Sequence, residues 1–186
     1  MVRKPTLILL VVFAVLIGLV IFLQKNPQPS KVSQTPSPTP MAYVFPGVEQ
    51  GSITKIELKI KGSSEVIQVR RDGQNEWVLG PDGEEKVEIG KVEQLRAEIT
   101  ALRVNTQMPE DMIDSALGLV DPAFTLIVQT SQNQKHALQI GDLTPIATGY
   151  YAQYNEGTAF VVSNTAVDTI VGLMQELGAP AETPAP

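Results

Sequence analysis

The chain has 186 residues, 43% of them hydrophobic, and its 20 acidic and 14 basic residues give a net charge of −6. Residues 41–186 hold 10 of the basic residues and all 20 acidic ones, so this part carries a charge of −10. Such an acidic surface repels phosphate backbones, which argues against nucleic acid as a partner. The chain has no cysteine, which excludes disulfides, thiolate metal sites and a cysteine nucleophile.

Residues 6–23 form an apolar run without a single charged side chain. As a helix this run spans about 27 Å, close to the hydrocarbon thickness of a bilayer. It is longer than the core of a signal peptide, and no small-x-small cleavage site follows it, so we expect a retained transmembrane helix in contact with lipid. Arg3 and Lys4 favour a cytoplasmic N-terminus at residues 1–5 and an extracytoplasmic C-terminal part of a single-pass cell-membrane protein.

Two small residues in this run, Ala14 and Gly18, stand four positions apart and share one helix face. This spacing allows a second helix to approach closely, although alanine and glycine are also common in such helices without that role. Ala14 and Gly18 are therefore the candidate helix-packing face in the membrane.

A proline-rich linker is expected at residues 24–48, because residues 26–40 contain five prolines among serine, threonine and glutamine. Such a segment buries little apolar surface and acts as a semi-extended spacer. Residues 49–178 then read as one extracytoplasmic domain, and residues 179–186 as a disordered tail.

The first half of this domain predicts strands followed by a helix. In residues 53–60, isoleucine and leucine alternate with lysine and glutamate, as in a half-exposed strand. Further strands are expected at residues 65–71 and 76–79, on either side of a turn at Asp72-Gly73. Residues 91–104 carry apolar side chains at helical spacing, which predicts an amphipathic helix.

The second half repeats this order. A short acidic helix is expected at residues 109–118, opened by Pro109 and closed by Gly118. The alternating patterns and the last apolar stripe then predict strands at residues 123–130, 135–141, 149–154 and 158–163, and a final helix ending at Gly178. Two strand-then-helix blocks in series indicate an α+β domain with a mainly antiparallel sheet.

Four short motifs follow one another along the domain. They are Trp77-Val78-Leu79, Gly118-Leu119-Val120-Asp121-Pro122, Ile140-Gly141-Asp142-Leu143-Thr144 and Gly149-Tyr150-Tyr151-Ala152. Together, over roughly residues 50–177, they resemble the uncharacterised family known as domain of unknown function 4340. The resemblance implies a single membrane span and, for some members, association with ABC-transporter components of the gliding-motility type. It implies no reaction and no catalytic residues.

No catalytic, metal or cofactor signature is recognisable. His136 is the only histidine, and its place in the strand alternation makes it a core-facing or rim residue. The chain has no nucleophile-elbow motif that could complete a catalytic triad with it. The acidic residues at 110–114 and 82–85 lack the spacing of a calcium loop, and the chain has no nucleotide-binding glycine motif. We therefore expect no enzyme activity, no cofactor and no metal.

These observations predict an accessory or scaffolding subunit of a larger membrane complex, with other membrane-protein subunits as partners. The complex is a transporter or a bioenergetic assembly, and the sequence does not choose between the two. The alternative is a ligand-binding domain that captures a small molecule or a cell-envelope fragment. Trp77, Tyr150 and Tyr151 are the candidate contacts for a partner or ligand; Tyr150 and Tyr151 should point to opposite sheet faces.

Overall fold

The structure is a computed structural model that describes residues 42–83, 85–110, 112 and 114–179. The strands are β1 (Ile53–Ile60), β2 (Val66–Arg71), β3 (Trp77–Leu79), β4 (Glu85–Lys86), β5 (Val104–Gln107), β6 (Phe124–Thr130), β7 (Lys135–Leu143), β8 (Gly149–Tyr154) and β9 (Phe160–Ser163). The helices are α2 (Ile89–Ala101) and α3 (Asn164–Gly178), with short 3-10 turns η1 (Gln50–Ser52) and η2 (Asp114–Leu117).

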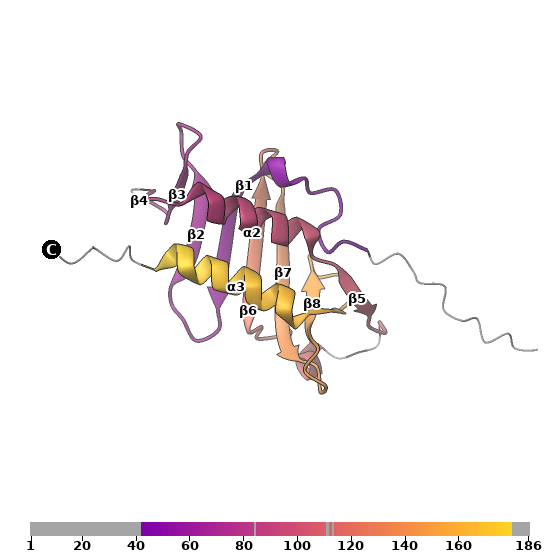
Figure 1. Cartoon of the computed structure of the whole chain (residues 1–186). Helices are drawn as coiled ribbons and strands as arrows, with labels where there is room; N and C mark the ends of the chain where they lie inside the picture. Colours follow the sequence, from indigo (N-terminus) through magenta and orange to yellow (C-terminus); the bar gives the residue numbers. More distant parts are fainter. Residues whose placement is uncertain (1–41, 84, 111, 113, 180–186) are drawn as a thin grey trace, which may run out of the picture. The chain divides into compact units, whose positions relative to one another are not determined.

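All nine strands belong to one antiparallel sheet in the order β4-β3-β2-β1-β6-β7-β8-β9-β5. Strands β1 to β4 form one meander and β6 to β9 a second, and the two are joined where β1 pairs with β6. Helices α2 and α3 lie next to each other on one face of the sheet (Figure 1). The α+β prediction with a mainly antiparallel sheet is confirmed, with both strand blocks forming one continuous sheet.

The alternation of side chains explains which face the helices cover. In β6, Leu126 and Val128 are fully buried, whereas the residues that alternate with them, Thr125 and Ile127, are only partly covered. Because successive side chains in a strand point to opposite faces, one face of β6 is apolar and belongs to the core. The same face receives four buried positions of α2, namely Val92, Leu95, Arg96 and Ile99, and six of α3, namely Val167, Ile170, Val171, Leu173, Met174 and Leu177.

The other sheet face is covered in part by the segment around η2. Leu117, Leu119 and Ala159 form a second buried cluster against Met108 and Tyr151. This cluster depends on glycine, because a Cβ on Gly141 would lie 2.2 Å from the backbone oxygen of Leu117. The η2 segment therefore rests directly on the backbone of β7.

The folded domain begins N-terminal to the expected boundary at residue 49. Val44, Phe45 and Val48 are buried in the main core, although they fall in the expected linker at residues 24–48. Two backbone hydrogen bonds hold this start in place, Val44 N–H to the Leu102 carbonyl (2.9 Å) and Val104 N–H to the Ala42 carbonyl (2.8 Å). Three apolar side chains within five residues outweigh the proline-rich composition that precedes them.

Two predicted helices differ from the structure. The helix expected at residues 91–104 runs instead over Ile89–Ala101, and Val104 begins β5, where it pairs with Val162. The helix expected at residues 109–118 was wrong, because the described residues of this segment (109, 110, 112 and 114–118) form only the 3-10 turn Asp114–Leu117. Leu117 and Leu119 are buried two positions apart, a spacing that an α-helix does not present on one side.

Neither α2 nor α3, nor any other helix among the described residues, has the length and hydropathy needed to cross a bilayer. The expected span at residues 6–23, with Ala14 and Gly18, lies outside the described residues, as do residues 1–41 as a whole and the expected tail from residue 180 onward.

We predict opposite effects for alanine at two glycines. Gly141→Ala should lower the free energy of unfolding by about 2 kcal/mol or more, because the new methyl group collides with backbone. Gly172→Ala, inside α3 with nothing within 4 Å of its Cβ position, should raise it by about 0.5–1 kcal/mol. Urea denaturation of the full chain, followed by fluorescence of Trp77, the single tryptophan, measures both. Equal effects of the two substitutions would contradict this packing.

Candidate functional site

Trp77 is a core residue, only 5% exposed, and two guanidinium groups flank its indole. Arg71 lies 5.1 Å from the ring centroid and Arg96 lies 5.6 Å from it. Such cation–π contacts stabilise buried cations that would otherwise lose hydration. Trp77 therefore offers little surface to a partner in this conformation, and its role as a contact stays a prediction.

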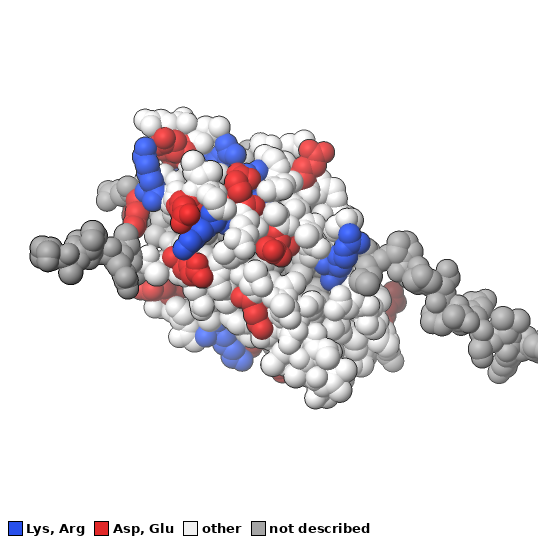
Figure 2. Space-filling view, viewed as in Figure 1, with Lys and Arg blue, Asp and Glu red and all other residues white. Residues whose placement is uncertain are grey.

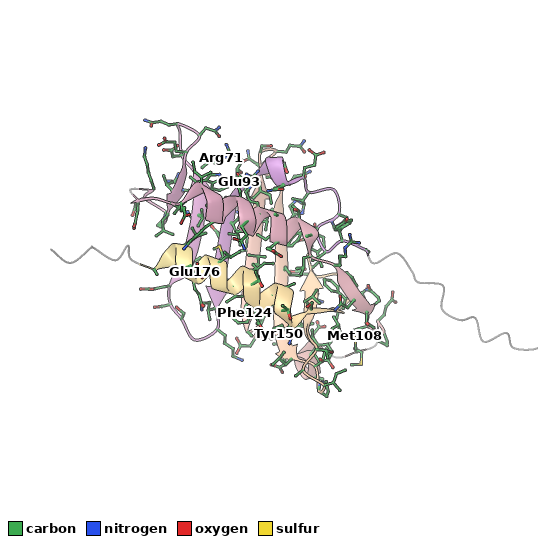
Figure 3. The ribbon with its side chains drawn as sticks, in the orientation of Figure 1. Arg71, Glu93, Met108, Phe124, Tyr150 and Glu176 are labelled. Carbon is green, nitrogen blue, oxygen red and sulfur yellow. The ribbon has the colours of Figure 1, made fainter. Side chains whose placement is uncertain are left out.

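The buried Arg96 links α2 to the start of the domain. Its guanidinium binds the Glu93 carboxylate on the same helix and the backbone carbonyl of Gln50 in η1. Its side chain is almost fully buried, so both acceptors matter for compensating its charge. Figure 3 labels Glu93, which belongs to α2, and Arg71, which ends β2.

Tyr150 and Tyr151 point to opposite faces of β8, as predicted. Tyr150 packs on the main core, edge-on to Phe124 with ring centroids 6.3 Å apart, beneath the start of α3 (Figure 3). Its hydroxyl donates a hydrogen bond to the Asp168 carboxylate of α3 over 3.0 Å. Tyr151 packs against the second cluster with Leu117. Both rings are half-buried, and the structure does not bring them together with Trp77 at one site.

A group of exposed aliphatic side chains marks one end of the sheet. Val120 is 74% exposed, Ile146 is 77% exposed and Leu143 is 47% exposed. Val120 lies in the loop before β6, and the other two lie at the end of β7 and in the loop after it. Because β6 and β7 are antiparallel neighbours, the start of β6 and the end of β7 lie at the same end of the sheet. We call the two loop segments that carry these three side chains the apolar loops.

Ion pairing and turn hydrogen bonds hold the apolar loops in position. Lys61 in the β1–β2 turn forms an ion pair with the Asp121 carboxylate (2.9 Å) and also donates to the backbone carbonyl of Asp121 (3.2 Å). Within the other loop, Ala147 N–H donates to the Thr144 carbonyl over 2.8 Å. Val120 and Leu143 belong to the family-like motifs, but their sequence pattern did not predict that they are exposed. The signal that could have indicated exposure is an aliphatic residue two positions before a proline, at Pro122 and at Pro145.

The opposite end of the sheet holds a cavity of about 370 Å³. It lies between the segment that precedes β1 and the turn that joins β6 to β7. A hydrogen bond from Ser131 N–H to the Ser52 carbonyl (2.7 Å) connects these two segments. The cavity is lined by Pro46, Gly47, Glu49, Ser52, Thr130, Gln132, Gln134 and His136.

Two residues that line this cavity each contain a polar atom that is buried beneath its surface and has no hydrogen-bond partner in the described part of the chain. They are the hydroxyl Oγ1 of Thr130, whose residue is 5% exposed, and Nε2 of His136. Both belong to the core-facing side of the sheet, since His136 pairs with Val128 in the register of β6 and β7. Buried polar groups are nearly always paired in folded proteins, so two unpaired ones at one cavity need an explanation.

A tyrosine contacts the other ring nitrogen of His136. Nδ1 lies 2.5 Å from the hydroxyl oxygen of Tyr154, and the two rings stack with an interplanar angle of 12°. The two side chains therefore form one hydrogen-bonded pair beside the cavity, in which either partner can supply the proton.

The acidic residues do not converge on a cation site. Among residues 42–83, 85–110, 112 and 114–179, no three histidine, aspartate or glutamate side chains lie close enough to hold a metal ion. On the helix-covered face, acidic and basic side chains are interspersed rather than gathered in a patch of one sign (Figure 2). The His136 cavity is therefore the candidate functional site best supported by its geometry.

Comparison with known proteins finds no matching family model, no matching curated protein and no matching solved structure.

Replacing Thr130 by valine should stabilise the fold. Valine has the shape of threonine but no hydroxyl, so it removes a buried polar group that lacks a partner. We expect Thr130→Val to raise the free energy of unfolding by about 1 kcal/mol, measured by urea denaturation. A clear loss of stability would mean that the hydroxyl is satisfied within the folded chain.

Two of the four tyrosines should ionise above the ordinary tyrosine value of about 10. Burial raises the pKa of Tyr154, and burial together with the hydrogen bond and charge of Asp168 raises the pKa of Tyr150. A raised folded-state pKa means that stability present at lower pH is lost as the pH rises from about 10 through the folded value. In an ultraviolet titration, Tyr150→Phe and Tyr154→Phe should each lose one component that ionises late. Loss of an early component in either variant would contradict the raised pKa.

Proposed function

We propose that this chain is a membrane-anchored, extracytoplasmic accessory or scaffolding subunit of a larger membrane complex, a transporter or a bioenergetic assembly, without catalytic activity of its own. The uncharged run at residues 6–23 supports the anchor, and the acidic domain supports a position away from anionic headgroups. The observation that carries the proposal is the set of apolar loops, which presents Val120, Leu143 and Ile146 to solvent at one end of the sheet.

The apolar loops suit a protein partner better than a lipid surface. Aliphatic side chains exposed together on one side of a folded domain commonly mark a contact with another protein or with a membrane. Here the exposed carboxylates of Asp121 and Asp142 flank the aliphatic side chains, and an anionic bilayer surface would repel them. An apolar centre with a charged rim is the usual arrangement of a protein–protein contact.

The loops are also prepared for docking by their own internal contacts. The ion pair between Lys61 and Asp121 fixes the loop before β6 against the neighbouring turn. A loop that is ordered before binding loses less conformational entropy when the partner docks. The proposed partner is another subunit held at the same membrane.

A second candidate function is capture of a small ligand, and the cavity beside His136 is the specific observation that favours it. This cavity lies away from Trp77, Tyr150 and Tyr151, which are the contacts expected from the sequence. The two functions involve opposite ends of the sheet and are compatible in one protein.

The docking proposal predicts that the double substitution Val120→Ser and Ile146→Ser releases the partner. Full-length protein would be purified from its native membranes in mild detergent, and retained proteins would be identified by mass spectrometry. The intact mass in the same sample reports whether residues 1–23 remain attached. We expect a stoichiometric set of membrane proteins with the unchanged chain and a loss of at least about tenfold with the double variant.

Ile89→Ser provides the matched control, because Ile89 is 66% exposed at the start of α2 rather than on the loops. It should retain the partners. A chain that is purified alone with its anchor intact would contradict the subunit proposal, and equal losses in the control and the double variant would contradict the role of the apolar loops.

A further inference from the structure

The sheet face opposite α2 and α3 carries much of the positive charge of the domain. We call it the uncovered face, because both helices lie on the other side of the sheet (Figure 1). In β1, Ile56 and Leu58 belong to the core, so the side chains that alternate with them point to the uncovered face. By this alternation and the strand register, the basic residues that point to the uncovered face are Lys55, Lys59, Arg70, Lys86 and Lys135.

Four of these cations form a row across neighbouring strands. Lys55 of β1 lies opposite Arg70 of β2 on one side and Gln129 of β6 on the other. Gln129 lies opposite Lys135 of β7, and two strands beyond Arg70 the row ends at Lys86 of β4. Neighbouring strands are about 4.8 Å apart, so the row extends over about 24 Å. We call these four residues the cationic row.

Ion pairs within the domain neutralise only part of this charge. Lys55 and Lys86 each have a carboxylate oxygen 2.6 Å from their Nζ. Lys135 and the neighbouring Lys59 are exposed, and neither forms an ion pair with a described residue. Like charges on neighbouring strands repel one another, so an anionic surface placed against the row would be bound favourably.

An anionic surface lies on the other half of the same face. The segment around η2 covers part of β7 and β8 there, since it rests on Gly141 and packs against Tyr151. Three exposed acidic residues line one cavity beside this segment, namely Glu110, Asp114 and Glu156. We call them the acidic group. None of the three forms an ion pair with a described residue.

The cationic row and the acidic group lie toward the same end of the sheet. Lys135 is the first residue of β7, directly after the β6–β7 turn. Glu156 lies in the turn after β8, where the N–H of the adjacent Asn155 donates to the carbonyl of Ala137 near the start of β7 (2.9 Å). The row and the group therefore occupy the two halves of the uncovered face at a similar height along the strands.

We propose that the uncovered face binds a second copy of this chain, with the cationic row of each copy against the acidic group of the other. A two-fold axis parallel to the strands exchanges the two halves of the face and keeps the height along the strands, so both contacts form at once. On β6 and β7, in the middle of the sheet, the partly exposed Ile127 and Ala137 add apolar surface between the charged regions.

The charge pattern favours a second copy over other anionic partners. A linear polyanion or an unrelated acidic protein would match the cationic row but leave the acidic group without a counterpart. A second copy matches both, because the complementary surface belongs to the chain itself. The inference goes beyond the accessory-subunit proposal and does not depend on it, since the apolar loops lie at the opposite end of the sheet and stay free for another partner.

Charge reversal on each half of the face, followed by mixing, tests this pairing. One variant carries Lys59→Glu and Lys135→Glu, and the other carries Glu110→Lys and Glu156→Lys; all four side chains are exposed. Sedimentation velocity of the full-length protein in density-matched detergent at low salt should show a dimer of the unchanged chain. In each variant alone, the dissociation constant of the dimer should rise at least about tenfold.

An equimolar mixture of the two variants should restore the dimer. In a mixed pair, the reversed row meets the reversed acidic group on one side, and the two unchanged surfaces meet on the other. Lys91→Glu, on α2 and therefore on the helix-covered side, is the control and should dimerise like the unchanged chain. Raising the salt from about 0.05 M to about 0.5 M should weaken the dimer of the unchanged chain, because salt screens contacts between exposed charges.

Three results would overturn the inference. The first is an unchanged chain that stays monomeric at low salt up to about 100 µM, as expected if the row serves another acidic partner. The second is a dimer that persists in both charge variants, as expected if residues 6–23 hold it together. The third is a mixture that stays monomeric although circular dichroism shows both variants to be folded. None of these results bears on retention of membrane partners by the apolar loops, so this inference and the accessory-subunit proposal can fail separately.

Discussion

The pairing of β1 with β6 is the contact on which the rest of the domain depends. Each meander is built from local hairpins, but β1 and β6 are separated along the chain by three strands, α2 and β5. Closing so long a loop costs chain entropy, and the fully buried cross-strand pairs Ile56 with Val128 and Leu58 with Leu126 offset it. The pairing of β1 with β6 makes the apolar face of the sheet continuous, so that α2 and α3 can pack on it. The same pairing brings the segment near residue 50 beside the β6–β7 turn.

The residues that stabilise the fold and the surfaces available for binding lie in different parts of the domain. The helix-covered face holds the main core, including the buried Arg96 that ties η1 to α2. The two ends of the sheet differ in chemistry, since one carries exposed aliphatic side chains with flanking carboxylates and the other carries a polar cavity. Strand ends and their loops carry these features because strand interiors are committed to pairing on both sides.

Sequence reasoning located most elements but not the residues that matter at the sites. The alternating run at residues 124–130 and the apolar stripe of α3 matched the structure because each pattern repeats with the period of its own backbone. The helix expected at residues 109–118 and the expected end of the linker at residue 48 were wrong. Contacts with strands distant in the sequence determine the structure of both segments. At the candidate site residues, the alternation of side chains along a strand correctly predicted that Tyr150 and Tyr151 point in opposite directions. The sequence did not predict that Trp77 is buried between two arginines.

By itself the sequence determined the α+β class, the positions of most strands and of the last helix, and the sides of β8 to which its tyrosines point. These properties are local, because backbone geometry repeats every two residues in a strand and every 3.6 in a helix. The tertiary structure alone decided that the two strand blocks form a single sheet, that Phe45 belongs to the core, and that Thr130 and His136 meet the segment before β1 at one cavity. Those outcomes depend on contacts between residues far apart in the sequence, such as Ile56 with Val128, which no local repeat encodes.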